Sequence, residues 1–193
     1  IVYNKSSTKD KMKTGKDKIQ IIDDFLPQKE FQEIQSTIME GWPFLDAQDT
    51  PHHEHIGWAY STTVADKDEP KNWKYFYLVH VMYMQPTLLS PHIFEKIIPV
   101  LKKLNVKALI RIKANLFPNS EKIHEHEAHT DFSYSHYTAL FSLNTCNGYT
   151  KFSDGTKVDS VANRILIFDG SLSHQSTTTS DTTARFNINF NYF

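Results

Sequence analysis

The chain has 193 residues, of which 39% are hydrophobic and 22% are charged, and its formal net charge is −1. This length suits one domain with a sizeable core, and the near-neutral charge argues against nucleic acid as a partner. A single cysteine, Cys146, excludes a disulfide framework within the chain and favours a reducing, cytoplasmic location. Because no apolar run approaches the ~20 residues of a membrane span, no membrane contact is expected.

The N-terminal part of the sequence predicts an arm, a short strand and a helix. Residues 1–18 carry a run of lysines and are expected to form a flexible, solvated arm. Residues 19–27 are typical of a strand that enters a turn. In residues 28–41, apolar side chains recur at spacings of three and four, which predicts a helix that ends at Gly41.

The middle of the chain is less regular. Residues 42–60 indicate a loop-rich stretch, and the aromatic-rich segment 73–83 is compatible with either a helix or a strand. A second helix is predicted over 91–105, where Pro91 fits the first turn and the apolar residues share one face. Pro99 lies inside this helix and is expected to kink it.

From residue 106 onward, short alternating segments are separated by turn signals. The predicted strands are 106–117, 137–144, 148–152, 156–161, 164–168 and 184–193. In the last strand, the odd positions from 185 to 191 are polar and the even positions from 186 to 192 are apolar. The pattern predicts a single α+β domain over 1–193, in which the helix-rich part 19–105 supports a sandwich or jelly roll over 106–193.

The stretch 124-HEHEAHTD-131 is dense in potential metal ligands and allows three interpretations. It could be a solvated polar loop. It could also belong to a zinc hydrolase, because the spacing of His124, His126 and His129 is similar to the HxHxDH motif of metallo-β-lactamase-like hydrolases. Ala128, however, stands where that motif needs an aspartate.

The third interpretation starts from His129 and Asp131. On a strand, residues i and i+2 point the same way, so both side chains can reach one ion and begin a 2-His-1-carboxylate facial triad. His174 follows a predicted strand and can supply the second histidine. Arg185, on the polar face of the last strand, can bind a carboxylate in a bidentate manner beside the metal. The ordered pattern HxD…H…R is more specific than any of its parts.

With these residues, the sequence resembles the iron(II)- and 2-oxoglutarate-dependent oxygenases, in particular the prolyl-4-hydroxylase-like branch of marine phages and bacteria. The resemblance covers residues 106–193, with a weaker match in 19–27. Residues 143–152 are similar to the family's strand–turn–strand after the HxD motif, and residues 162–174 to its approach to the distal histidine. The resemblance implies a double-stranded β-helix, or jelly-roll, core with N-terminal supporting helices.

The resemblance also implies roles for single residues. His129, Asp131 and His174 would bind iron, Arg185 would bind the C5 carboxylate of 2-oxoglutarate, and Asn189 would add a hydrogen bond to this cosubstrate. The implied activity is that of a dioxygenase that hydroxylates a peptidyl residue such as proline, a free amino acid or a small metabolite, with release of succinate and CO2. The implied cofactors are Fe(II), 2-oxoglutarate and O2, with ascorbate as an optional reductant.

The chain departs from the prolyl-hydroxylase pattern near the cosubstrate. Phe117 and Ser142 stand where the family usually has tyrosines, and Phe117 has no group that can donate a hydrogen bond. Ser142 retains a shorter hydroxyl group. Asn115, on the same strand face as Phe117, or Tyr137 is expected to compensate.

Substrate contacts are expected from aromatic side chains in two loops: Tyr134 directly after the HxD motif, and Trp58 with Tyr60 in the middle of the chain. His124 and His126 are expected either at the rim of the site or directly behind the metal ligands. A second metal site at His52, His53 and His55 lacks a supporting partner. The alternative function is a non-catalytic jelly-roll binding module with a structural metal or none, and the oligomeric state stays open.

Overall fold

The computed structural model describes residues 19–45, 51–64 and 74–193, with the backbone alone for 42–45 and 51–54. The predicted arm over 1–18 lies outside these residues. The helices are α1 (Gln28–Met39) and α2 (Pro91–Lys103). The strands are β1 (Ile19–Ile22), β2 (Trp42–Leu45), β3 (Pro51–Glu54), β4 (Ala59–Ser61), β5 (Tyr77–Met84), β6 (Thr87–Leu88), β7 (Leu109–Pro118), β8 (Tyr137–Ser142), β9 (Tyr149–Phe152), β10 (Lys157–Asp159), β11 (Ile165–Asp169), β12 (His174–Ser176) and β13 (Ala184–Tyr192).

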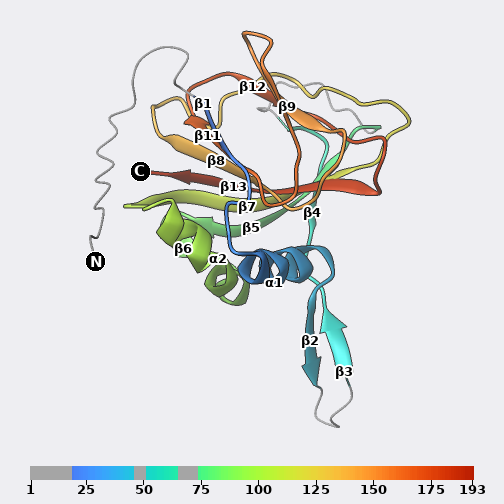
Figure 1. Ribbon diagram of the computed structural model, residues 1–193, viewed down its shortest axis with the longest axis vertical. Coiled ribbons are helices and arrows are strands. Elements are labelled where there is room, and N and C mark those ends of the chain that lie inside the picture. Colours follow the sequence, from blue (N-terminus) through green and yellow to red (C-terminus); the bar gives the residue numbers. More distant parts are fainter. Residues whose placement is uncertain (1–18, 46–50, 65–73) are drawn as a thin grey trace, which may run out of the picture.

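The strands form one large sheet, one small sheet and a separate hairpin, and their pairing is antiparallel throughout. The large sheet has the order β1-β11-β8-β13-β7-β5-β4, with β6 paired to β5. The small sheet has the order β10-β9-β12, and β2 pairs with β3. In Figure 1 the two helices lie on one side of the large sheet, and β9 and β12 lie on the other.

The main hydrophobic core lies between the large sheet and the helices. Helix α1 buries Phe31 and Ile34 at the predicted helical spacing, and Gly41, just after its end, has a φ of 87° that favours glycine. The ring of Phe141 on β8 is 5.8 Å from that of Phe31 and 6.0 Å from that of Phe25. This packing fixes one face of the sheet against the helices.

A second hydrophobic cluster joins the small sheet to the opposite face of the large sheet. It contains buried residues from β8, β9, β10 and β11: Leu140, Phe152, Val158, Leu166 and Phe168. The rings of Phe152 and Phe168 meet edge to face at 5.1 Å. The large sheet is therefore covered on both faces, and polar residues on its second face are buried as well.

Because the large sheet is covered on both faces, strand β13 has buried residues on both of its faces. Its apolar positions Ile188 and Phe190 face the helices, while Arg185, Asn187, Asn189 and Asn191 on the other face are only 0–4% exposed. Their partners on β7 are Phe117, Asn115, Lys113 and Arg111 in register. Buried polar groups need partners, so this polar ladder marks the place where a functional site is expected.

One prediction of secondary structure was wrong and one open assignment is now settled. The stretch 42–60 is not simply a loop, since it contains β2, β3 and the start of β4. The segment 124–131 contains no strand and is held by isolated bridges from Glu125 to Thr177 and from His129 to His174. The aromatic-rich segment 73–83 contains a strand, β5.

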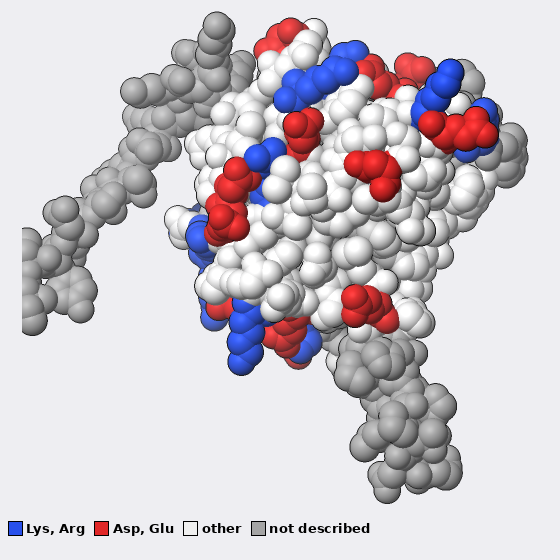
Figure 2. All heavy atoms as spheres, turned by 45° about the vertical axis from the view of Figure 1, so that its right-hand side comes forward, with Lys and Arg blue, Asp and Glu red and all other residues white. Residues whose placement is uncertain are grey.

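Charges of both signs are interspersed on the face shown in Figure 2, where the residues that are described form no extended basic patch. Among the described residues, none of the helices has the length and hydropathy that a membrane crossing requires.

Candidate metal centre

His129, Asp131 and His174 come together at one end of the small sheet. Each offers one ligand atom, and these atoms lie within 4.8 Å of one another. The two histidines form a backbone bridge, with N–H···O distances of 3.0 and 2.9 Å between their amides and carbonyls. Cross-strand pairing, rather than the spacing within one strand, thus brings the two imidazoles to the same place.

Both histidines are oriented by a carbonyl two residues earlier in the chain. The Nδ1 of His174 lies 3.0 Å from the oxygen of Leu172, and that of His129 lies 3.3 Å from the oxygen of Glu127. An Nδ1–H that donates to a carbonyl leaves Nε2 as the free ligand atom. Burial lowers the pKa of His129 to about 4, helped by the neighbouring His174, whose own pKa burial also lowers. Both rings are therefore neutral at pH 7, as metal binding requires.

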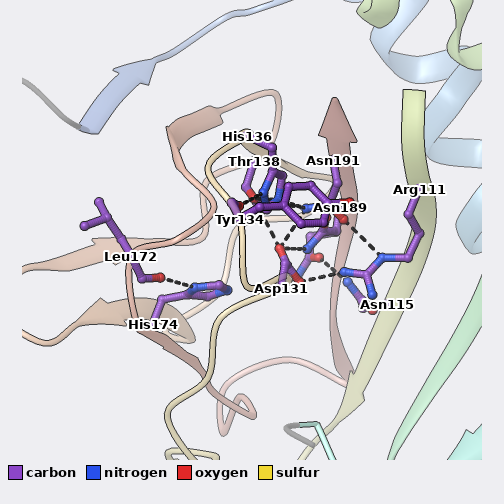
Figure 3. A network of polar contacts seen from close by, with 11 residues as sticks. Arg111, Asn115, Asp131, Tyr134, His136, Thr138, Leu172, His174, Asn189 and Asn191 are labelled. Carbon is purple, nitrogen blue, oxygen red and sulfur yellow. Dashed lines mark hydrogen bonds and ion pairs between the residues drawn. The ribbon is translucent and has the colours of Figure 1, made fainter. Parts of the chain in front are cut away.

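Asp131 is the centre of a dense hydrogen-bond network (Figure 3). Its Oδ1 accepts from Arg111 at 2.6 Å, while Oδ2 accepts from Asn191 at 2.9 Å and from Asn189 and Thr138 at 3.2 Å. Burial alone would raise the pKa of this carboxyl, but the Arg111 charge and the further cations and donors hold it well below its usual value. Since Oδ1 has a single donor, it retains a lone pair for a metal ion.

The network continues behind Asp131. Asn191 accepts from Arg111 Nε at 3.1 Å and also lies 3.1 Å from Nε2 of the buried His136. Gly170 permits this packing, because a Cβ at that position would lie 2.2 Å from the His136 ring. The roles of Arg111 and Asn191 were not predicted, although both share a strand face with residues that were.

Arg185 is a buried cation at the far end of the polar ladder, with only 2% of its surface exposed. Its Nη1 donates to the carbonyls of Tyr149 and Thr177 at 2.9 and 3.3 Å, and its Nη2 donates to Thr150 Oγ1 at 3.0 Å. Gly148 allows this approach, since a Cβ there would lie 2.8 Å from Arg185 Cδ. Burial lowers the arginine's pKa to about 10. No carboxylate of a described residue forms an ion pair with it.

One cavity connects Arg185 with the three potential metal ligands. It is also lined by Lys113, Asn115, Asn187 and Asn189. Among the described residues, buried side-chain atoms without a hydrogen-bond partner are Asn115 Oδ1, His126 Nε2, Ser176 Oγ, Arg185 Nε and Asn189 Oδ1. All except His126 belong to residues that line this cavity. Arg185 Nε and Ser176 Oγ can donate to an anionic ligand, whereas the two amide oxygens are acceptors and need a donor such as water.

Of the residues expected to stand in for the family's tyrosines, some line the cavity and others do not. Asn115 lines the cavity, and its Nδ2 donates to Asn187 Oδ1 at 2.9 Å. Phe117 forms an apolar wall of the cavity. Ser142 is buried but is not among the residues that line it. Tyr137 stacks on Tyr192 at 5.5 Å, on the helix side of the sheet, so it does not compensate for Phe117.

The three aromatic residues expected to contact substrate do not lie together at the cavity. Trp58 packs 6.2 Å from Phe186 against the main core on the helix side, away from the cavity. Tyr60 is 50% exposed and lies opposite Leu78, which faces away from the cavity. Tyr134 remains close to the metal ligands, in the loop after Asp131, and is 45% exposed. Its ring stacks on Phe132 and Phe193 and does not line the cavity.

The other histidines of the HEHEAHTD stretch do not join the triad. His126 is buried, with 2% exposure, and its ring lies 5.4 Å from that of Phe117. Burial lowers its pKa to about 3, so it is a neutral interior residue rather than a rim residue. His124 stacks on Tyr75 at 3.8 Å. The side chains of His52 and His53 lie outside the described residues, and His55 is exposed.

Comparison with known proteins gives a consistent result at the level of the fold. No family model matches the chain, and no curated protein matches it by sequence. A 2OG-Fe(II) oxygenase family oxidoreductase from Burkholderia pseudomallei superposes with a TM-score of 0.64 and 10% identity, over 91% of this chain and 85% of that one. A prolyl hydroxylase from Trichoplax adhaerens, solved with a hypoxia inducible factor peptide, gives 0.55 and 14%, over 91% and 83%.

HygX from Streptomyces hygroscopicus, solved with nickel and 2-oxoglutarate, gives a TM-score of 0.53 and 10% identity over 91% of this chain and 82% of that one. These identities are too low to transfer an activity, but three similar structures agree on the architecture. The chain therefore has the fold of the 2-oxoglutarate- and iron(II)-dependent oxygenases, a group that includes prolyl hydroxylases.

Proposed function

We propose that this protein is an iron(II)- and 2-oxoglutarate-dependent dioxygenase that converts a substrate R–H, O2 and 2-oxoglutarate into R–OH, succinate and CO2. The observation that carries the proposal is one cavity that holds both a triad of metal-ligand atoms and a buried arginine that has no anionic partner in the described part of the chain. In this proposal the two sheets are the two halves of a double-stranded β-helix. Residues 106–193 supply this core, 19–105 support it, and together they form one domain.

Iron would be held by His129, Asp131 and His174, which supply two neutral nitrogens and one carboxylate oxygen. Bound iron with 2-oxoglutarate and oxygen supplies the oxidising power, through oxidative decarboxylation of the cosubstrate. Arg111 and Asn191 keep the Asp131 carboxylate ionised and hold it in one orientation. A carboxylate ligand also favours hydroxylation over halogenation, because halogenating relatives have a small residue at this position.

The lining of the inner cavity suits the charge of 2-oxoglutarate, a dianion, at the end that Arg185 occupies. Arg185 Nε has no hydrogen-bond partner among the described residues and is available to the distal carboxylate, while the other guanidinium nitrogens are fixed by Tyr149, Thr150 and Thr177. A fixed, dehydrated cation of this kind binds a carboxylate with little loss of entropy. Asn115 and Asn189 would complete the polar contacts, and Phe117 would exclude water from one side.

The substrate is proposed to be a peptide or a small molecule. The structurally similar proteins include one solved with a peptide and one, HygX, solved with hygromycin B. Tyr134 beside the metal ligands is proposed to pack against the substrate, as exposed aromatic rings near a site commonly do.

The proposal is tested by anaerobic titration with Fe(II) and 2-oxoglutarate, followed by measurement of succinate release after oxygen is admitted. We expect a visible metal-to-ligand charge-transfer band and iron-dependent succinate formation. The variant His174→Ala should lose both, because one ligand is removed. As a control, His92→Ala changes an exposed histidine on α2, on the other side of the sheet, and should retain both. If wild-type protein shows neither signal, the oxygenase assignment is wrong and a non-catalytic binding module becomes the better description.

A further inference from the structure

Lys113 lies in the middle of the polar ladder, between Val81 on β5 and Asn189 on β13. Its ammonium group forms no hydrogen bond and no ion pair with any residue that the structure describes. Its Nζ lies 5.7 Å from the centroid of the Tyr77 ring, and Arg111 and Asp131 lie near enough to act on its charge. A partly buried ammonium with three donors and no acceptor is unusual, because desolvated charges are normally paired. Its placement therefore indicates a missing anion.

Two cavities meet at Lys113. The inner cavity is lined by Arg185 and by three other residues with an unsatisfied polar atom: Asn115, Ser176 and Asn189. The outer cavity has a volume of about 460 Å³, within the usual range for small-molecule sites, and contains neither Arg185 nor Asn115. Both cavities include His129, Asp131 and Lys113. Lys113 thus lies beside the potential metal ligands, where the cavity that contains Arg185 meets the larger outer cavity.

The charges of the residues that line the two cavities also indicate a missing anion near Lys113. The described groups with a full charge that line the two cavities are Arg111, Lys113, Arg185 and Asp131. A divalent metal and dianionic 2-oxoglutarate would cancel each other, and Arg111 is paired with Asp131. Two cations then remain: Arg185, which is proposed to bind the distal carboxylate, and Lys113, which lines both cavities. A loaded site with surplus positive charge favours a further anion.

We propose that Lys113 forms a subsite for a carboxylate of the substrate, so that the hydroxylated substrate is an acidic molecule held next to the metal centre. This inference rests on the proposed function and narrows its substrate class. Arg111 adds to the positive field at the mouth of the outer cavity but is engaged by Asp131. Lys113 is therefore the cation that remains available to a substrate carboxylate.

The test uses protein loaded with Mn(II) in place of iron and with saturating 2-oxoglutarate, so that no turnover occurs. The probe is acetate, and its neutral isostere acetamide is the reference. Paramagnetic relaxation of the probe's methyl protons reports binding close to the metal. We expect saturable relaxation by acetate, none by acetamide, and at least a tenfold weaker acetate affinity in Lys113→Met. The exposed lysine variant Lys122→Met is the matched control and should bind acetate like wild type.

Other results would overturn the proposal in distinguishable ways. If Lys113→Met binds acetate as wild type does, the carboxylate coordinates the metal directly and Lys113 is not its subsite. If Lys113→Met loses affinity for 2-oxoglutarate instead, Lys113 belongs to the cosubstrate site. If acetate and acetamide behave alike, no anion subsite exists here. Failure of Mn(II) and 2-oxoglutarate to bind wild-type protein would overturn the proposed function together with this inference.

Discussion

Asp131 is the residue on which the polar ladder converges, and its environment has two separable parts. Arg111 contributes charge, whereas Asn189, Asn191 and Thr138 contribute neutral hydrogen bonds. A cation beside a carboxylate keeps it ionised but also competes with a metal for its electrons. Neutral donors orient the carboxylate without this competition, so they are the better target for a test of positioning.

At this scale we expect Asn191→Ala to weaken metal affinity by about 10–100-fold, because Asp131 loses its 2.9 Å donor and its fixed orientation. Asn187→Ala is the matched control. It lies on the same strand face but bonds to Asn115, so metal affinity in the absence of 2-oxoglutarate should change little. Calorimetric titration with Mn(II) gives both values. Equal weakening in the two variants would mean that general loosening of the ladder, and not the orientation of Asp131, controls the affinity.

Single residues could be predicted from the sequence where an ordered motif connected them. His129 and Asp131 are far from His174 and Arg185 in the sequence, yet all four line one cavity. Lys113 could not be predicted in the same way, because a polar residue on an alternating strand is normally exposed to solvent. Its burial depends on the small sheet, and no periodicity in a single sequence shows that a second sheet will cover that face.

At the scale of elements, the segment 124–131, which carries His129 and Asp131, is not a strand of either sheet. Besides its isolated bridges, it is held by Glu125, whose Oε1 accepts from Tyr149 at 2.6 Å and whose Oε2 accepts from Lys151 at 2.5 Å. Hydrogen bonds from Lys151, and then from Tyr149, lower the pKa of Glu125 to about 2 from its ordinary value of 4.5. This cluster anchors the segment to β9.

The anchor predicts a pH-dependent stability difference. A carboxyl whose pKa is lower in the folded state stabilises the protein above its unfolded pKa, and this contribution is lost as pH falls through the folded pKa. Glu125→Gln should therefore destabilise the protein by about 1 kcal/mol at pH 6. The difference from wild type should shrink between pH 5 and about 2. Urea unfolding of both proteins across this range measures the effect, and a difference independent of pH would exclude the ion-pair explanation.

The sequence did not predict the short polar strand β12. The strand β12 consists of His174, Gln175 and Ser176, and it exists because β9 and the His129 segment pair with it on either side. Neither β-branched composition nor alternation predicts such a strand. Both helices and the longer strands from β7 onward were predicted because their apolar residues repeat with the period of the element, whereas the segment of β5 was left open between helix and strand.

For the whole molecule, the informative feature is the order of strands in the large sheet. The sequence neighbours β7 and β8 are separated by β13, and β1 pairs with β11. A periodic pattern in one sequence does not specify such non-local pairing, so only the family resemblance led to an expectation of the topology. The topology matters for function because it places β13, with its polar face, between β7 and β8 and beneath the small sheet.

This arrangement predicts that ligand binding stabilises one region before it stabilises the whole protein. Metal and 2-oxoglutarate together should raise the free energy of unfolding by about 2.7 kcal/mol at a hundredfold excess over their dissociation constant. Hydrogen exchange should slow in 124–131, β12 and β13, whose polar groups face the cavity, and should be nearly unchanged in α1 and α2, which pack on the other face. 2-Oxoglutarate without metal should slow exchange much less, because Arg185 alone would hold it. The variant His174→Ala, when given metal and 2-oxoglutarate together, should show only the small protection that wild type shows with 2-oxoglutarate alone. Equal protection of helices and site segments would instead mean that the ligands act only through global unfolding.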